Sequence, residues 1–432
     1  MPSMTDHIVV QLKGKKILIL GFGREGQSTL RFLCRHLPKA QITIADAALP
    51  GKDHSIPENI RTLFGSHYLD GLSEAELIIK TPGIPTRLLQ LRPGQQLRSQ
   101  TDLFLSAFRH QTIGVTGTKG KSTTSALIYH LLSQAGKPVV LTGNIGTPCL
   151  DSIEQITPET TVVFELSANQ LENVRHSPGV AVLLNIFEEH LDHFGSMDTY
   201  RQAKLNILRF CMPGDTAIVH RTLQSVIPPI GGQVHFFPEP AFHLPSLPVL
   251  RGEHNRSNAQ AAILAAMATG FQEQELIPLL NSFKGLPHRL EYLGLKAGVH
   301  FYNDSIATIP EATVAALETL GKVNFLILGG FDRGIHYELL ANYLLEHPVD
   351  HLLFTGQAGQ RIASLLSITP GIMHLHFFEE LKEAFEIISQ NCHVGDICLL
   401  SPAAASYDRY KNFEQRGDLF RSLTETFSNK TS

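Results

Sequence analysis

Short apolar runs rich in β-branched residues alternate with stretches of helical composition along the whole chain. The runs KKILILG, QTIGVTG and VNFLILGG each predict a buried strand. Helices are expected over residues 23–35, over residues 120–135 and from Pro310 onward. Strands that alternate with helices in this way are typical of parallel sheets flanked by helices. The pattern therefore predicts an α/β fold.

Turn-forming residues divide this alternation into three blocks. The strand QTIGVTG opens the second block, and the stretch KGLPHRLE precedes the third. Because proline and glycine interrupt regular structure, such stretches are expected between domains. We therefore expect three domains, over residues 1–109, 110–286 and 287–432.

Composition places the chain among soluble globular proteins. Of its 432 residues 43% are hydrophobic and 18% are charged, and the formal net charge is -4. Without a basic excess, neither nucleic acid nor a membrane is expected as a partner. The chain has no signal-peptide pattern and no apolar run of about 18 residues, and its five cysteines show neither paired nor metal-binding spacing. We expect a cytoplasmic protein with reduced thiols.

A glycine-rich motif, GFGREG, follows the first strand and precedes the first helix. It contains Gly21, Gly23 and Gly26, and Asp46 ends the next strand about 20 residues later. This matches the Rossmann fingerprint, whose glycines let the backbone approach a diphosphate. A dinucleotide and a UDP-sugar both carry such a group. The alternative is a turn whose glycines serve only strand–helix packing.

A second loop, GVTGTKGKSTT, carries a stronger signal for phosphate binding. In phosphate loops between a strand and a helix, backbone N–H groups and a lysine bind phosphates, and a Ser or Thr ligates magnesium. Lys121 and Ser122 occupy these two positions, whereas Val115 departs from the strict pattern. The residues expected at the nucleotide phosphates are Gly114, Gly117, Thr118, Lys119, Gly120, Lys121, Ser122 and Thr123.

Three residues of the second block offer ligands for a hard cation. Glu165 ends the strand VVFE, His190 lies in NIFEEHLDHFG, and Lys204 lies on the helix that follows. Magnesium takes few carboxylates besides phosphate oxygens, so one glutamate and Ser122 would suit it. Each residue also has an ordinary interpretation: a solvated strand end, an exposed histidine and a lysine on a helix surface.

Polar loops follow the apolar runs of the third block. NDSIAT, GGFDRG and SPAAASYDRYKNFEQRGD each come directly after a predicted strand. Because ligand loops of α/β proteins lie at the carboxyl ends of strands, these loops are candidates for a binding site. The alternative for KNFEQRG is the solvated start of an amphipathic helix.

Together these motifs resemble the Mur ligases of bacterial cell-wall synthesis. The resemblance covers nearly the whole chain and rests on GFGREG, KTPGIP, GVTGTKGKST, TGNIGTP, ELSANQLE, EEHLDHFG, YRQAKLNI, GEHNRSNAQAA, LPHRLE, FYNDSIAT, LGGFDRG and LLSPAAASYDRYKNFEQRGDLF, in this order. It implies a Rossmann-like first domain that binds the UDP part of a sugar nucleotide and a central ATPase domain of the P-loop type. A mobile Rossmann-like third domain would bring in an amino acid.

The resemblance also implies roles for individual residues. Lys121, His190 and Lys204 would be catalytic. Ser122 and Glu165 would hold one magnesium ion, and His190 and a carbamylated Lys204 would hold a second. Three further residues would contact ATP: Asn258, Arg289 and Asp304. The sugar nucleotide and the amino acid would be bound by Gly23, Arg24, Glu25, Asp46, Asn144, Ser167, Gln170, Thr308, Arg333, Ser406, Tyr407 and Phe413.

The implied reaction joins a carboxylate to an amine. ATP would phosphorylate the carboxylate of UDP-N-acetylmuramoyl-L-alanine, and glutamate would attack the acyl-phosphate, in a monomeric enzyme. D-Glutamate is the first candidate. Ile306 and Arg333 stand where the family usually has lysine, and Arg24 and Glu25 also differ from the commoner residues. L-Glutamate, or another amino acid of the Mur ligases, therefore remains an alternative.

Three other functions fit parts of the sequence. An NAD-dependent dehydrogenase would explain GFGREG and Asp46 but would leave Glu165, Lys204 and the second glycine loop without a role. A ligase of the folylpolyglutamate synthase type shares the ATPase core and also adds glutamate, but it has no preceding UDP-binding domain. A nucleotide-sensing regulatory protein would keep the phosphate loop but would need no second metal site.

Overall fold

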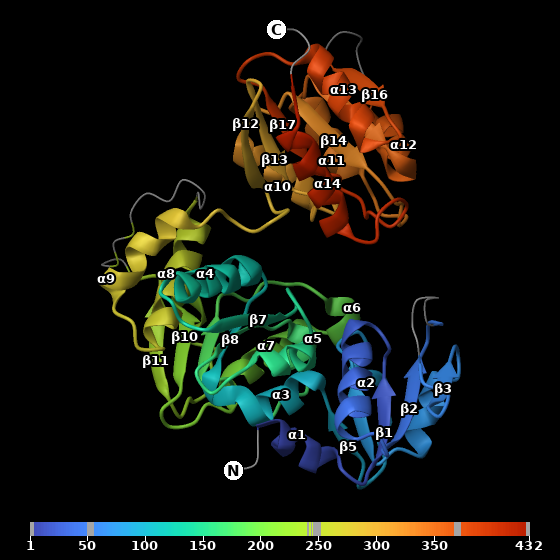
Figure 1. Ribbon diagram of the computed structural model, residues 1–432, viewed down its shortest axis with the longest axis vertical. Helices are drawn as coiled ribbons and strands as arrows, with labels where there is room; N and C mark the ends of the chain where they lie inside the picture. Colours follow the sequence, from blue (N-terminus) through green and yellow to red (C-terminus); the bar gives the residue numbers. More distant parts are fainter. Residues whose placement is uncertain are drawn as a thin grey trace. The chain divides into compact units, whose positions relative to one another are not determined.

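A five-stranded parallel sheet, here the first sheet, opens the fold in the computed structural model. The structure describes residues 4–49, 56–239, 242, 244, 252–366 and 373–428. The strand order is β3-β2-β1-β4-β5 (Figure 1). Its strands are β1 (Lys16–Leu20), β2 (Gln41–Asp46), β3 (Arg61–Phe64), β4 (Leu77–Lys80) and β5 (Gln96–Arg98). The accompanying helices are α1 (Met4–Leu12), α2 (Arg24–His36) and α3 (Gln100–Phe108).

The second sheet has six parallel strands in the order β11-β10-β9-β6-β8-β7. Its strands are β6 (Thr112–Thr116), β7 (Val139–Gly143), β8 (Thr161–Glu165), β9 (Val180–Leu183), β10 (Thr216–His220) and β11 (Gln233–Phe237). The helices are α4 (Lys121–Gln134), α5 (Ala168–Leu171), α6 (Leu191–Phe194), α7 (Met197–Arg209), α8 (Glu253–Met267) and α9 (Glu273–Leu276). β6, β8 and β9 are fully or almost fully buried because both faces of the sheet are covered.

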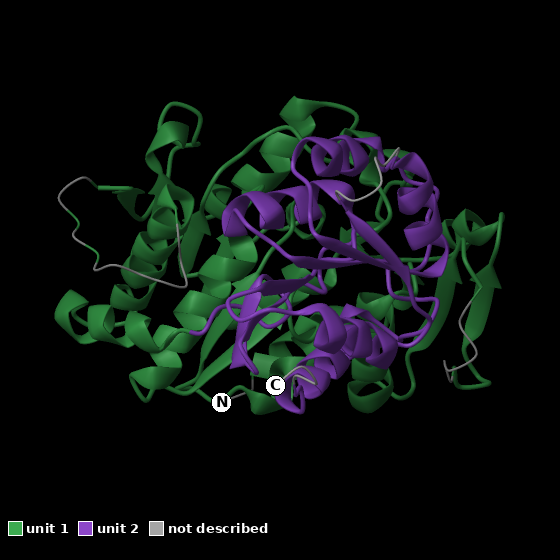
Figure 2. Ribbon diagram, turned by 90° about the horizontal axis from the view of Figure 1, so that it is seen from above, with its two compact units in different colours: residues 1–283 green, residues 284–432 purple. Residues whose placement is uncertain are grey.

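One apolar core joins these two sheets. It contains Ile17 and Ile19 of β1, Phe104 of α3 and Phe164 of β8. The rings of Phe104 and Phe164 meet edge to face, with their centroids 5.5 Å apart. Residues 1–283 therefore form one compact unit, and residues 284–432 form the other (Figure 2).

The third sheet makes up the second unit and has the order β12-β13-β17-β14-β15-β16. Its strands are β12 (Glu291–Lys296), β13 (Val299–Asn303), β14 (Phe325–Gly329), β15 (His351–Thr355), β16 (His374–Phe377) and β17 (Ile397–Leu400). The helices are α10 (Pro310–Leu320), α11 (Glu338–Glu346), α12 (Gly356–Leu365), α13 (Leu381–Asn391) and α14 (Phe413–Glu425). The first three helices pack on one face of the sheet and the last two on the other.

The predicted α/β class is confirmed, with one addition. β12 pairs antiparallel with β13, so the third sheet is mixed rather than purely parallel. The sequence analysis did not predict β12 or helix α1. No helix in the described part of the chain is long and apolar enough to cross a bilayer.

Asp102 on α3 ties the two sheets of the first unit together. Its side chain is fully buried, pairs with Arg98, and accepts a hydrogen bond of 2.7 Å from the backbone N–H of Arg175. Nδ1 of His176 lies 3.0 Å from the same carboxylate. Burial is the largest single effect and raises the pKa of Asp102, but His176, Arg98 and the N–H of Arg175 together outweigh it and hold that pKa below its usual value.

We expect Asp102→Ala to lower the free energy of unfolding by about 3–5 kcal/mol, because it leaves Arg98 without its buried partner. Asp151→Ala removes the more exposed ion pair with Arg31 and should cost no more than about 1 kcal/mol. Urea denaturation followed by circular dichroism measures both. Equal effects of the two substitutions would contradict the stabilising role of the buried Asp102 carboxylate.

Candidate active site

The loop after β6 turns tightly into helix α4. Gly120 has a φ of 87°, and a Cβ at this position would lie 2.6 Å from Oδ1 of Asn258 on α8. Only glycine meets both constraints without strain. Asn185, after β9, accepts hydrogen bonds from the backbone N–H of Lys119 (2.8 Å) and of Thr118 (2.9 Å). The loop is thereby fixed at the N-terminus of α4, a position that favours anions.

Gly114 lies in the strand before the loop, unlike the later glycines of this motif. It lies within β6, and a Cβ there would be 2.7 Å from Cγ of Pro178. Its small size therefore serves packing beneath the loop.

Two lysine side chains meet at one carbonyl oxygen of the loop. Nζ of Lys121 donates to the carbonyl oxygens of Gly117 (3.0 Å) and Thr118 (3.1 Å), and Nζ of Lys204 donates to that of Gly117 (2.7 Å). Lys204 is 2% exposed, so its interpretation as a surface lysine is wrong. Burial, and then the positive charge of Lys121, lowers the pKa of Lys204 to about 7.

Tyr200 completes this cluster, although it was not among the predicted site residues. It is fully buried, and its hydroxyl lies 3.0 Å from Oγ1 of Thr118. Nζ of Lys204 lies 4.9 Å from the centre of its ring. Tyr200 and Lys204 are four residues apart on α7, so helical periodicity places them on one face. That spacing is the sequence signal that could have identified Tyr200.

Glu165 ends β8 in a fully buried position, and its interpretation as a solvated strand end is wrong. Nδ2 of Asn144 donates to Oε1 of Glu165 at 2.7 Å, which brings two predicted site residues together. Oε2 is buried and has no hydrogen-bond partner among the described residues. Because an unpartnered buried oxygen is costly, a cation bound at Oε2 would relieve that cost. Glu165 therefore fits a magnesium ligand.

His190 lies at the start of α6 with a φ of 57°. Its Nε2 is 3.6 Å from Oε2 of Glu189, and its ring is 6.1 Å from that of Tyr200. The side chain is 53% exposed and open to a ligand. Within the described part of the chain, no three His, Cys, Asp or Glu side chains are grouped around a common metal position. The structure brings Lys121 and Lys204 together at the carbonyl oxygen of Gly117.

The first glycine loop is shaped by close contacts. A Cβ at Gly21 would lie 1.8 Å from Oγ1 of Thr81, and one at Gly26 would lie 2.1 Å from the carbonyl oxygen of Gly21. A Cβ at Gly23 would have no other atom within 4 Å. Packing therefore requires the first and third glycines, whereas Gly23 leaves room for a ligand.

Asp46 and the two residues after Gly23 make contacts within the first unit. The Asp46 carboxylate accepts hydrogen bonds from the backbone N–H of Phe22 and of Ala48. The side chains of Arg24 and Glu25 reach loops of the second sheet, where Gln170 donates to Glu25. Ser167 lies beside Gln170 in a capping box at the start of α5.

The predicted ATP residues of the second unit lie at the start of the third sheet. Asp304 is 6% exposed and accepts hydrogen bonds from Oγ of Ser401 (2.8 Å) and from the backbone N–H of Leu290 (3.0 Å). Burial raises the pKa of Asp304 to about 6. Arg289 precedes Leu290, and its positive charge opposes this rise.

The predicted amino-acid residues lie on three loops of the second unit. Nη2 of Arg333 donates to the carbonyl oxygen of Thr308 at 2.5 Å. Ser406 is buried, Tyr407 is 69% exposed, and Phe413 begins α14.

Arg416, which the sequence analysis missed, links two of these loops. It is 4% exposed, and its Nη2 donates to the carbonyl oxygens of Ser305 (2.8 Å) and Ala404 (3.1 Å). The interpretation of KNFEQRG as the solvated start of a helix is therefore wrong at Arg416. Burial lowers the pKa of Arg416 to about 10.

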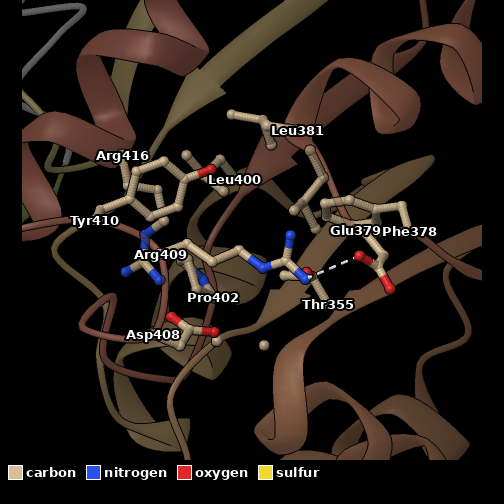
Figure 3. Close-up of a pocket in the computed structure, with 13 residues that line it drawn as sticks. Thr355, Phe378, Glu379, Leu381, Leu400, Pro402, Asp408, Arg409, Tyr410 and Arg416 are labelled. Carbon is tan, nitrogen blue, oxygen red and sulfur yellow. Dashed lines mark ion pairs between the residues drawn. The ribbon is translucent and has the colours of Figure 1, made fainter.

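A pocket lies beside these loops, at the carboxyl ends of β14, β15 and β17. Its walls include Gly330, Thr355, Pro402 and Asp408, and Arg409 pairs with Glu379 at 3.7 Å across it (Figure 3). The predicted amino-acid residues are not among its lining residues. Pocket and predicted residues therefore share an edge of the sheet but not a cavity.

Three family models match the chain. They are the MurD-like N-terminal domain of Mur ligases at residues 15–99, the Mur ligase middle domain at 115–227 and the Mur ligase glutamate ligase domain at 288–404. A relative from Geobacillus kaustophilus, UDP-N-acetylmuramoylalanine--D-glutamate ligase, is 32% identical over 440 residues, which cover 94% of this chain and 96% of the relative. A relative of the same name from Symbiobacterium thermophilum is 34% identical over 397 residues, or 84% and 87% of the two chains.

Solved structures share the fold. UDP-N-acetylmuramate-alanine ligase MurC from Thermotoga maritima has a TM-score of 0.57 and 19% identity, over 95% of this chain and 99% of that chain. MurF ligase from the same organism, in complex with ADP, has a TM-score of 0.55 and 18% identity, over 99% and 100%.

The matches to these relatives show an ATP-dependent ligase, and the loop after β6 with its two lysines fits that class. The chain belongs to the Mur ligase family, whose members use ATP and Mg²⁺.

The lowered pKa of Lys204 predicts how stability depends on pH. Between about pH 7 and its ordinary pKa of 10.5, Lys204 is neutral in the folded protein and protonated in the unfolded chain. The unfolded state then binds more protons, so stability gains from rising pH across this window. In CO2-free buffer, the unfolding free energy of the native protein minus that of Lys204→Met should therefore rise from pH 7 to pH 10. A difference that does not change with pH would contradict the lowered pKa of Lys204.

Proposed function

We propose that the protein adds D-glutamate to UDP-N-acetylmuramoyl-L-alanine, with conversion of ATP to ADP and phosphate, in cytoplasmic peptidoglycan precursor synthesis. The relatives that match nearly the whole chain carry this activity in their names. The geometric observation that carries the proposal is the meeting of Lys121 and Lys204 at the carbonyl of Gly117. Residues 1–109 would bind the UDP part, 110–286 ATP and 287–432 the amino acid, in a monomer.

Binding and positioning of ATP fall to the loop after β6. Lys121 would turn from the carbonyls of Gly117 and Thr118 to the phosphates, with Asn258 behind Gly120. Ser122 and Glu165 would hold one Mg²⁺ ion, and His190 and Lys204 a second; when bound, these ions neutralise charge on the phosphates. The unpartnered Oε2 of Glu165 supports the first of these positions.

Amide formation then proceeds in two steps. A carboxylate oxygen of the acceptor attacks the γ-phosphorus, and the bond to the β–γ bridging oxygen breaks, so ADP leaves. The glutamate amine next attacks the acyl carbon, loses a proton to solvent, and expels inorganic phosphate as the C–O bond breaks. The protein's part would be to align these groups and to stabilise the oxyanion, a role that Lys121 would take.

Lys204 would act as a carbamate. Its amine must be neutral to form a bond with carbon dioxide, with release of one proton, and burial beside Lys121 favours the neutral amine. The carbamate is an anion and a hard ligand, whereas an ammonium would repel magnesium.

Phosphate release with ATP, Mg²⁺ and UDP-N-acetylmuramoyl-L-alanine tests the proposed substrates. We expect turnover with D-glutamate and little with L-glutamate. Turnover with L-glutamate alone would overturn the stereochemical assignment and implicate Ile306 and Arg333. The absence of turnover with both would overturn the acceptor assignment.

Lys204→Arg tests whether Lys204 forms a carbamate, because an arginine side chain keeps a positive charge but does not form a carbamate. Turnover should fall by more than about 100-fold, the scale for losing one group that stabilises the transition state. With ¹³C-bicarbonate, the native protein should show a carbamate carbon resonance that this variant lacks. Full activity of the variant, or the same resonance in both proteins, would rule out this role.

A further inference from the structure

The first two side chains of helix α2 point from the first glycine loop to the second sheet. Nη2 of Arg24 donates to the carbonyl oxygen of Gly146 at 2.6 Å. Oε1 of Glu25 accepts a hydrogen bond of 2.7 Å from Nε2 of Gln170. Both contacts join the first sheet's domain to loops that follow strands of the second sheet.

Each contacted loop carries predicted acceptor-binding residues. Gly146 lies two residues after Asn144, whose side chain is bound to Glu165. Gln170 is 4% exposed, and its Oε1 accepts from the backbone N–H of Ser167 at 2.9 Å. The Gln170 amide is therefore fixed at both ends, by Ser167 on one side and by Glu25 on the other.

We propose that Arg24 and Glu25 are positioning residues that hold the loops 144–146 and 167–170 in the geometry needed to bind the acceptor. This inference rests on the proposed function, and it replaces the expectation that these two side chains contact the sugar nucleotide. The two contacts link the domain of the first sheet to both loops. This linkage makes the affinity for the acceptor depend on how the domain of the first sheet packs against the domain of the second sheet.

The Glu25 carboxyl group is placed to hold Gln170 in either protonation state, because Oε1 remains an acceptor. Its Oε2 is buried without a hydrogen-bond partner in the described part of the chain. Burial raises the pKa of Glu25 to about 7, against Gln170 and the charges of Lys80 and Arg24. The thiol of Cys149 also lies close, and its pKa is raised by burial and by Glu25. The native state retains a proton that the unfolded chain releases, so stability falls as pH rises from about 4.5 through 7.

Three variants separate positioning from other roles. Glu25→Leu removes the acceptor for Gln170, whereas Glu25→Gln keeps an oxygen at that position and removes the charge. Arg31→Met is the matched control, because Arg31 lies on the same helix and pairs with Asp151, which is outside both loops.

Hydrogen–deuterium exchange of the ligand-free chain and the KM values for acceptor and ATP are measured for each variant. Glu25→Leu should speed exchange over residues 167–170 and raise the acceptor KM about tenfold, the effect of one lost hydrogen bond. The KM for ATP should stay unchanged. Glu25→Gln should keep the native exchange and the native acceptor KM, and it should remove the fall in stability between about pH 4.5 and 7. Arg31→Met should match the native protein.

Unchanged exchange over residues 167–170 in Glu25→Leu would overturn the inference, whatever the activity. A raised acceptor KM in both Glu25 variants with native exchange would also overturn it, in favour of direct contact with the nucleotide. If the native protein does not turn over this acceptor, the proposed function fails, and the exchange data still decide the positioning role.

Discussion

The carbonyl oxygen of Gly117 accepts hydrogen bonds from the side-chain nitrogens of two lysines, Lys121 and Lys204. Two cations in a buried place repel each other, and one carbonyl dipole offsets only part of that cost. The site can lower its energy in two ways: Lys204 can lose its proton, or an anion can enter. Both outcomes suit a site for nucleotide phosphates, so the repulsion between the two lysines and the loop's affinity for phosphate have one origin.

This arrangement requires that three strands end side by side. β6 lies between β8 and β9, although β7 separates β6 from β8 along the chain. The order places the phosphate loop next to Glu165 at the end of β8 and next to Asn185 beyond β9. Helix α7 then brings Tyr200 and Lys204 beneath the loop, where Tyr200 contacts Thr118. The carboxyl edge of one parallel sheet thus gathers residues that are distant in sequence.

The sequence predicted the strand–helix alternation and the phosphate loop because both depend on local spacing. It did not predict that Lys204 is buried, since an isolated lysine on a helix carries no sign of what packs against it. The sequence also did not predict the orientation of the Glu25 side chain, because that side chain contacts Gln170 only when the two domains are packed together. Strand β12 was not predicted because its sequence, EYLGLK, lacks the run of β-branched residues that marked the predicted strands.

Arg333 shows how a substitution of the family's usual lysine changes the chemistry of the second unit. Its guanidinium donates to the carbonyl of Thr308, which fixes two predicted amino-acid loops to each other. An arginine has further N–H groups in the same plane, so it can hold the loop and still present donors to a carboxylate. Ile306 adds no charge nearby, and its backbone N–H is bound to the carbonyl of His288. Of these two positions, Arg333 alone therefore carries a positive charge, and its hydrogen bond to Thr308 fixes how that charge is oriented.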